Sequence, residues 1–178
     1  MRAMVLDTVA PVTADSNPLR GTEYPDPEPG NGELVLRVLA CGVCHTELDE
    51  IEGRLPVREL PVIPGHEVVG EVAAVGAGVD AGLGQRFGVA WIYSACGECE
   101  WCRSGRENLC PEFRGTGCDA DGGYAEYMRV PAGFAIPFPD ALEPCQGAPF
   151  LCAGAVGYRA LRLTGIGDGA RLGLTGFG

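Results

Sequence analysis

Residues 33–43 read ELVLRVLACGV and residues 66–79 read HEVVGEVAAVGAGV, and these two stretches decide the fold class. Both are rich in β-favouring apolar residues, which predicts strands. Residues 86–92 (RFGVAWI) and 123–130 (GYAEYMRV) have the same character and are bounded by Gly, Asp or Pro. Residues 20–32 hold three prolines and three glycines, which predicts a surface loop. Up to about residue 140 the chain is therefore predicted to be mainly β, a partly open β-barrel with long loops.

The sequence changes character near residue 145. Residues 148–163 read APFLCAGAVGYRALRL, with apolar residues three or four apart, which predicts a helix. The recurring apolar positions are Leu151, Ala155, Tyr158 and Leu161.

The last residues predict the opening of a second domain. Residues 170–178, ARLGLTGFG, are predicted to form an apolar strand that runs into Gly176 and Gly178. A strand that enters G-x-G opens a dinucleotide-binding unit, which also needs a following helix. We therefore expect a domain over residues 1–147, and over residues 148–178 a linker helix with the start of a truncated Rossmann domain.

Charge and composition exclude several classes of function. The 178 residues carry a formal net charge of -11, and all 13 basic residues are arginines. No basic stripe is present for a phosphate backbone, so nucleic acid is not an expected partner. The absence of lysine also excludes Schiff-base and P-loop chemistry.

Neither a membrane span nor a secretory segment is expected. Arg37 interrupts the longest apolar run, and Asp7 comes before a secretory apolar core could form. We therefore expect a cytoplasmic protein. Nine cysteines in a reducing compartment indicate metal ligands before disulfides.

Four cysteines have the spacing of a metal cage. Cys96, Cys99, Cys102 and Cys110 form C-x2-C-x2-C-x7-C. Four thiolates this close in sequence can close a tetrahedron around a structural zinc. An iron–sulfur cluster is the alternative, although bacterial ferredoxins place three residues in the last gap rather than seven.

A second, dispersed set of ligands is Cys44, His66, Glu67 and Cys152. Two cysteines and one histidine from separate elements, with an open fourth position, are a ligand set that suits a catalytic zinc. Taken singly, each residue also has an ordinary structural explanation in a core or a turn.

Five motifs carry a family resemblance. CGVCHTEL, PGHEVVGEV, CGECEWCRSGRENLC, DGGYAEYM and LCAGAVGYRAL follow one another between residues 41 and 161. The chain resembles the N-terminal, GroES-like catalytic domain of the zinc-dependent alcohol dehydrogenases of the medium-chain dehydrogenase/reductase family. The resemblance implies a GroES-like barrel with a zinc-binding lobe and reversible hydride transfer between an alcohol and NAD or NADP.

The resemblance also implies roles for single residues. Cys44, His66 and Cys152 would hold the catalytic zinc, with Glu67 close by, and the four-cysteine motif would hold a structural zinc. Thr46 matches a hydroxyl that starts a proton relay, and Glu47 matches a carboxylate that orients the zinc-bound imidazole.

The next relay position holds Asp49 where many relatives have histidine, so either Asp49 or water passes the proton on. His45 matches a residue beside the cofactor pyrophosphate, and Trp91, Ile92 and Leu48 match the substrate pocket. Cys41, Cys118 and Cys145 receive no role and are expected to be buried thiols.

The expected partners are a small alcohol or aldehyde and, for the full-length protein, one or three further copies of itself. Two other functions remain open: a non-catalytic zinc-stabilised GroES-like module, and an NADPH-dependent aldehyde reductase. The fragment alone is expected to be inactive, because it lacks most of the nicotinamide site.

Overall fold

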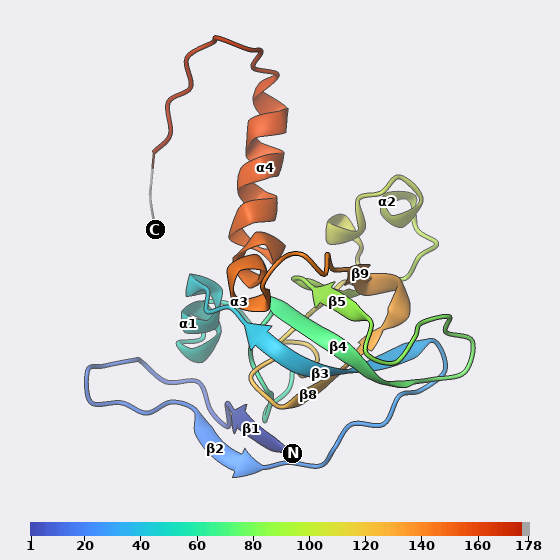
Figure 1. Ribbon diagram of the computed structural model, residues 1–178. Coiled ribbons are helices and arrows are strands. Elements are labelled where there is room, and N and C mark those ends of the chain that lie inside the picture. The colour runs from blue at the N-terminus through green and yellow to red at the C-terminus, as the bar shows by residue number, and fades with distance from the viewer. Residues whose placement is uncertain (176–178) are drawn as a thin grey trace.

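A computed structural model describes residues 1–175 of the chain (Figure 1). The strands are β1 (Arg2–Val5), β2 (Arg20–Glu23), β3 (Glu33–Cys41), β4 (Val68–Val75), β5 (Arg86–Val89), β6 (Ile92–Ser94), β7 (Arg114–Gly115), β8 (Tyr127–Pro131) and β9 (Ala135–Pro137). The α-helices are α1 (His45–Ile51), α2 (Glu100–Arg103), α3 (Pro144–Gly147) and α4 (Ala153–Thr164). Short 3-10 turns are η1 (Glu107–Leu109), η2 (Ala132–Phe134) and η3 (Ala148–Leu151).

A curled antiparallel sheet in the order β8-β3-β4-β5-β9 forms the body of the molecule. Strand β3 lies between β8 and β4, and a register shift against β4 between Val35 and Leu36 interrupts the strict alternation of side chains. Leu34, Val35 and Leu36 are consequently all buried. The core against this sheet consists of Leu34, Leu36, Val68, Val72, Phe87, Val89, Met128, Val130 and Ala135. The prediction of a mainly β chain built on a partly open barrel is confirmed.

The four predicted strands are present with shorter bounds. Residues 66–79 contribute β4, and residues 86–92 divide into β5 and the first residue of β6. Residues 123–130 contribute only the start of β8, since residues 122–124 instead donate backbone hydrogen bonds to residues 63–65. These bonds position a functional motif, as described below.

The loop prediction for residues 20–32 is wrong at its start. Residues 20–23 form β2, which pairs with β1 in a separate two-stranded sheet. The three prolines begin only at Pro25, so the backbone N–H groups of residues 20–23 remain free to pair.

The predicted C-terminal helix is two segments rather than one. The turn η3 ends at Leu151, α4 begins at Ala153, and Cys152 between them has φ −124° and ψ −82°. From there α4 projects away from the sheet (Figure 1). Within residues 1–175, no helix has both the length and the apolar character needed to cross a bilayer.

The strand predicted over residues 170–178 is absent in residues 170–175, because no other strand lies beside them to pair with. Gly176 and Gly178, predicted to contact a cofactor, lie outside the described residues.

Candidate metal centre

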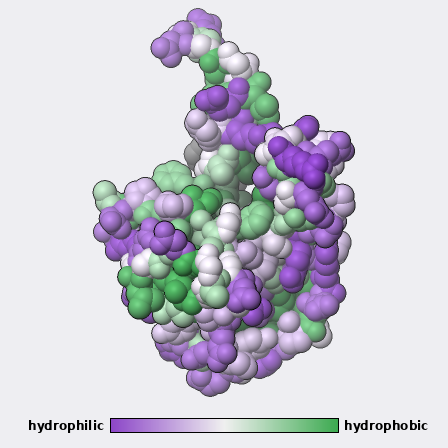
Figure 2. Space-filling model, turned by 90° about the vertical axis from the view of Figure 1, so that its right-hand side faces the viewer, coloured by the Kyte–Doolittle hydropathy of each residue, from purple (hydrophilic) through white to green (hydrophobic). Residues whose placement is uncertain are grey.

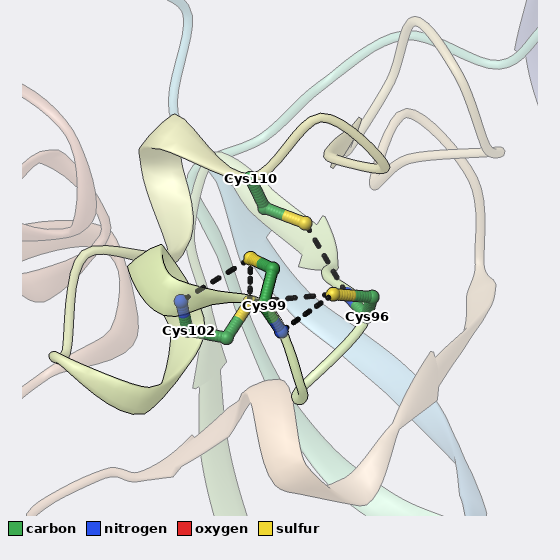
Figure 3. A group of neighbouring side chains, drawn as sticks. All are labelled: Cys96, Cys99, Cys102 and Cys110. Atoms are coloured by element: carbon green, nitrogen blue, oxygen red, sulfur yellow. Dashed lines mark hydrogen bonds between the residues drawn. The ribbon is translucent and has the colours of Figure 1, made fainter.

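The four-cysteine motif folds into a compact cage (Figure 3). The thiols of Cys96, Cys99, Cys102 and Cys110 point toward one another, and their sulfur atoms all lie within 4.8 Å. The Cys96–Cys102 and Cys99–Cys102 sulfur separations are 3.9 and 3.5 Å. Thiolates about 2.3 Å from a zinc ion at a tetrahedron's corners stand about 3.8 Å apart. The cage therefore fits a single zinc ion, whereas iron–sulfur ligands stand further apart around their cluster.

Backbone hydrogen bonds and burial shift the pKa values of the cage thiols in opposite directions. The backbone N–H groups of Glu98 and Cys99 lower the pKa of the Cys96 thiol to about 7. Burial raises the pKa of the Cys102 thiol to about 12. Without a cation the four sulfurs cannot all be thiolates at neutral pH, so a bound metal would supply the missing charge.

The first residue of the dispersed set, Cys44, is the N-cap of α1. Its backbone N–H donates to Oε2 of Glu47 at 2.7 Å, so that a capping box begins the helix. The cap fixes the direction in which the Cys44 thiol leaves the chain.

The second residue, His66, follows a turn that only glycine adopts easily. Gly65 has φ +102°, and a side chain there would also collide with Tyr124 and Cys41. The N–H groups of Gly123 and Tyr124 donate to the carbonyls of Gly65 and Pro64 at 2.9 Å each. The DGGYAEYM motif thereby holds the PGHEVVGEV motif in place.

The third residue, Cys152, occupies the break between η3 and α4. The side chain of Leu151 before it packs on β5 at Gly88, where an added Cβ would come within 2.8 Å of Leu151 Cδ2. This contact anchors the break against the sheet. The Cys152 and Cys44 sulfurs are 3.9 Å apart, although 108 residues separate them.

The four dispersed residues form a second metal-ready cluster. One ligand atom from each of Cys44, His66, Glu67 and Cys152 lies within 4.8 Å of the others. His66 is 1% exposed, and its Nδ1 lies 2.7 Å from Oε1 of Glu47. Both ring nitrogens are buried and make no hydrogen bond of good geometry within residues 1–175. Since Nδ1 lies against the Glu47 carboxylate, Nε2 is the nitrogen left to ligate a cation. This donor set of two sulfurs and one nitrogen fits zinc.

Burial raises the pKa of two groups in this cluster. Desolvation raises the pKa of the Glu67 carboxyl, which is 3% exposed. Burial and the neighbouring Cys44 raise the pKa of the Cys152 thiol to about 12. Both shifts would reverse beside a bound dication, because a nearby positive charge favours the ionised forms.

A cavity of about 730 Å³ opens beside this cluster. Thr46 lines it, with Oγ1 3.5 Å from the Cys44 sulfur. Trp91 and Ile92 line it as predicted, and Trp91 also meets the His66 ring edge-on at 5.1 Å. Leu48 does not line it, because on α1 it lies on a different face from Thr46 and Asp49, which are three residues apart.

The residues around Asp49 form a charged rim. Asp49 lines the cavity and accepts a 2.6 Å hydrogen bond from Nε of Arg54, which lines it too. His45 is exposed, with Nε2 3.8 Å from Oδ1 of Asp49. Arg54 and Asn108 were not predicted. Asn108 comes from the lobe that carries the cysteine cage, and only the tertiary arrangement brings that lobe to the cavity.

Glu50 is a third residue that the sequence analysis missed. It is fully buried, and neither carboxylate oxygen has a hydrogen-bond partner in the part of the chain that the structure describes. Desolvation, with Glu47 and Asp119 nearby, raises its pKa to about 8. A sequence signal was available: in a helix that begins after Cys44, Glu47 and Glu50 are three residues apart and therefore lie on the same face.

The three remaining cysteines differ from one another. Cys118 is buried and Cys41 is half-buried, and burial raises the pKa of both thiols to about 12. The prediction that Cys145 is buried is wrong. It lies in the first turn of the short helix α3 and is exposed to solvent.

Comparison with known proteins gives a consistent result. Residues 30–140 match the family model of the alcohol dehydrogenase GroES-like domain. A probable alcohol dehydrogenase of Mycobacterium tuberculosis is 51% identical over 174 residues, which are 94% of this chain and 50% of that protein. The chain spans about half the length of the curated relatives it matches.

Two solved structures show the same fold. Acetophenone reductase from Geotrichum candidum, in complex with NAD, has a TM-score of 0.79 and 31% identity, covering 93% of this chain and 48% of its own. A cobalt- and zinc-bound thermostable alcohol dehydrogenase from Pyrobaculum aerophilum has a TM-score of 0.77 and 30% identity, covering 90% and 48%. The chain thus belongs to the GroES-like domain family of the zinc-dependent, medium-chain alcohol dehydrogenases.

Proposed function

We propose that this chain is the catalytic domain of a zinc-dependent alcohol dehydrogenase that transfers hydride reversibly between an alcohol and NAD or NADP. The convergence of Cys44, His66 and Cys152 beside the cavity carries the proposal. A non-catalytic module would need the cysteine cage at most. It would have no use for a buried, unpartnered imidazole nitrogen that faces two thiols.

Two zinc ions would be bound. The cage of Cys96, Cys99, Cys102 and Cys110 would hold a structural ion. Cys44, His66 and Cys152, with Glu67 beside them, would hold the second. This second zinc, when bound, supplies Lewis-acid polarisation of an oxygen atom.

The residues of the chain would supply orientation and proton transfer. Glu47 holds the His66 ring through Nδ1, so that Nε2 is left for the metal. The hydroxyl of Thr46, at the cavity wall, would accept the proton of an alcohol and pass it outward. Asp49, at the rim and paired with Arg54, would receive that proton directly or through water.

The remaining half of the reaction would lie in a second domain. We propose a catalytic domain over residues 1–147, and over residues 148–178 a linker and the start of a dinucleotide-binding domain, with His45, Gly176 and Gly178 facing the cofactor. Helix α4 supports this division because it exposes apolar residues, among them Val156, Tyr158 and Leu163 at 66%, 63% and 73%. The helix projects at the top of Figure 2, with green hydrophobic residues among the purple ones. We further propose a cytoplasmic enzyme that assembles as a homodimer or homotetramer.

Metal content tests the proposal. The purified chain, loaded with zinc and freed of excess by gel filtration, should contain two zinc ions per chain by elemental analysis. Cys152→Ser should leave one ion, and Cys145→Ser, at the exposed cysteine, should leave two. A single ion in the wild-type chain would favour the non-catalytic module. The chain alone should not reduce NAD with ethanol, because α4 lacks its partner domain.

A further inference from the structure

Gly42, which lies opposite Glu67, is a glycine for a reason other than its backbone conformation. Gly42 follows β3, and its N–H donates to the carbonyl of Glu67 at 2.9 Å, which extends the pairing of Cys41 with Val68 by one step. Gly42 is absent from the residues with positive φ, so conformational freedom is not the reason for a glycine here. The reason must lie in what surrounds it.

The space beside Gly42 is filled by the Glu67 side chain. A Cβ added to Gly42 would lie 1.9 Å from Oε2 of Glu67, 2.9 Å from its Cδ and 3.0 Å from its Cβ. Cross-strand Cβ atoms ordinarily stand about 4.5–5.5 Å apart. The two backbones therefore approach more closely here than a pair of side-chain-bearing residues allows.

This close approach lies between two proposed ligands of the catalytic zinc. Gly42 stands two residues before Cys44, and Glu67 directly follows His66. Tyr124 closes the other side, where its hydroxyl donates to the Gly42 carbonyl at 3.5 Å. Displacement of either backbone here would move both ligands.

The Glu67 carboxylate has little alternative space. The residue is 3% exposed, and one of its carboxylate oxygens belongs to the cluster within 4.8 Å of the Cys44, His66 and Cys152 ligand atoms. A methyl group at position 42 would compel the buried carboxylate to leave its present position beside the ligand atoms of the cluster.

We infer that Gly42 is a positioning residue for the catalytic metal site: its missing side chain is the space in which the Glu67 carboxylate rests. This inference depends on the proposed function for its metal, but the contact between residues 42 and 67 can be tested separately. The glycine thus sets the distance between the loop that carries Cys44 and the segment that carries His66.

The test is a double-mutant cycle with Gly42→Ala, Glu67→Ala and the double variant. Cobalt is titrated into each chain, and the visible absorption of the two-sulfur, one-nitrogen site is followed. Gly42→Ala should weaken cobalt binding at this site at least tenfold and change its spectrum. The double variant should lie much closer to Glu67→Ala than Gly42→Ala lies to the wild type, because removal of the carboxylate removes the two shortest contacts and leaves only the 3.0 Å contact with the Cβ of residue 67. The tetrathiolate cage reports within each sample that the chain is folded.

Urea unfolding of the same zinc-loaded variants tests the contact without reference to the cobalt spectrum. Gly42→Ala should lower the midpoint relative to the wild type, and the same replacement in the Glu67→Ala background should lower it much less, because only the 3.0 Å contact with the Cβ of residue 67 remains. Gly82→Ala is the matched control, since a Cβ there meets nothing within 4 Å. Wild-type behaviour of Gly42→Ala, or additive losses in the double variant, would overturn the inference. A wild-type chain that binds cobalt only in its cage would contradict the proposed function and the metal role of Gly42, while the urea cycle would still decide the contact.

Discussion

Glu47 and His66 meet at 2.7 Å between Oε1 and Nδ1, in a contact from which water is excluded. The other oxygen of the same carboxylate accepts the backbone N–H of Cys44. One side chain therefore orients two proposed zinc ligands, one through its ring and the other through the start of its helix. Such outer contacts hold ligands in position before a metal arrives.

The first prediction concerns this carboxylate. Glu47→Ala should lower the zinc affinity of the Cys44, His66 and Cys152 site about 10- to 100-fold, because the imidazole loses its orienting partner and α1 loses its cap. Competition with a chromophoric chelator measures the affinity. Glu59→Ala, at an exposed glutamate, should leave it unchanged. Equal loss from the cysteine cage would show general unfolding instead.

The second prediction concerns the cysteine cage. Cys99→Ser should remove one zinc per chain and lower the thermal midpoint, because the Cys96 and Cys99 sulfurs accept backbone N–H groups and a bound metal would join the two ends of segment 96–110. Differential scanning calorimetry and elemental analysis measure the two effects. Cys145→Ser is the control and should alter neither. An unchanged midpoint in Cys99→Ser would mean that the lobe is stable without its metal.

The third prediction concerns pH and Glu50. The folded-state pKa of Glu50 is raised to about 8 from an ordinary value of 4.5. Between these two pH values the folded chain binds more protons than the unfolded chain, so Glu50 lowers the free energy of unfolding progressively as pH rises. The penalty becomes complete as the pH rises through the folded-state pKa of about 8.

Glu50→Gln should therefore be more stable than the wild type at pH 8, by up to a few kcal/mol. The difference should shrink as pH is lowered toward 6. Urea unfolding at several pH values measures it, with Glu59→Gln as the exposed control. A difference that stays constant with pH would show that Glu50 does not titrate in this range.

The fourth prediction concerns the turn before His66. Gly65→Ala should destabilise the chain by more than about 1–3 kcal/mol, because φ is +102° and the added methyl would lie 2.7 Å from Tyr124 and 2.8 Å from the Cys41 sulfur. Chemical denaturation measures the loss. Gly82→Ala meets open space without a positive φ and should change stability little. Similar losses in both would point to a general effect of glycine replacement.

Several features could be read from residue order alone. The strands at 33–41 and 68–75 follow from dense apolar and β-branched residues, because such runs bury one or both faces of a sheet. The cage at 96–110 follows from a spacing short enough for one segment to surround an ion by itself. The five motifs identified the family, which the comparisons confirm.

Other features depend on contacts between distant segments, and no local pattern records them. Three predictions failed for this reason: that Cys145 is buried, that residues 170–175 belong to a strand, and that Leu48 lines the cavity. The tertiary structure alone shows that Arg54 and Asn108 line the cavity and that Gly42 lies close to Glu67. A cysteine cage is a property of 15 consecutive residues, whereas the second site joins residues 108 positions apart, and only packing sets that distance.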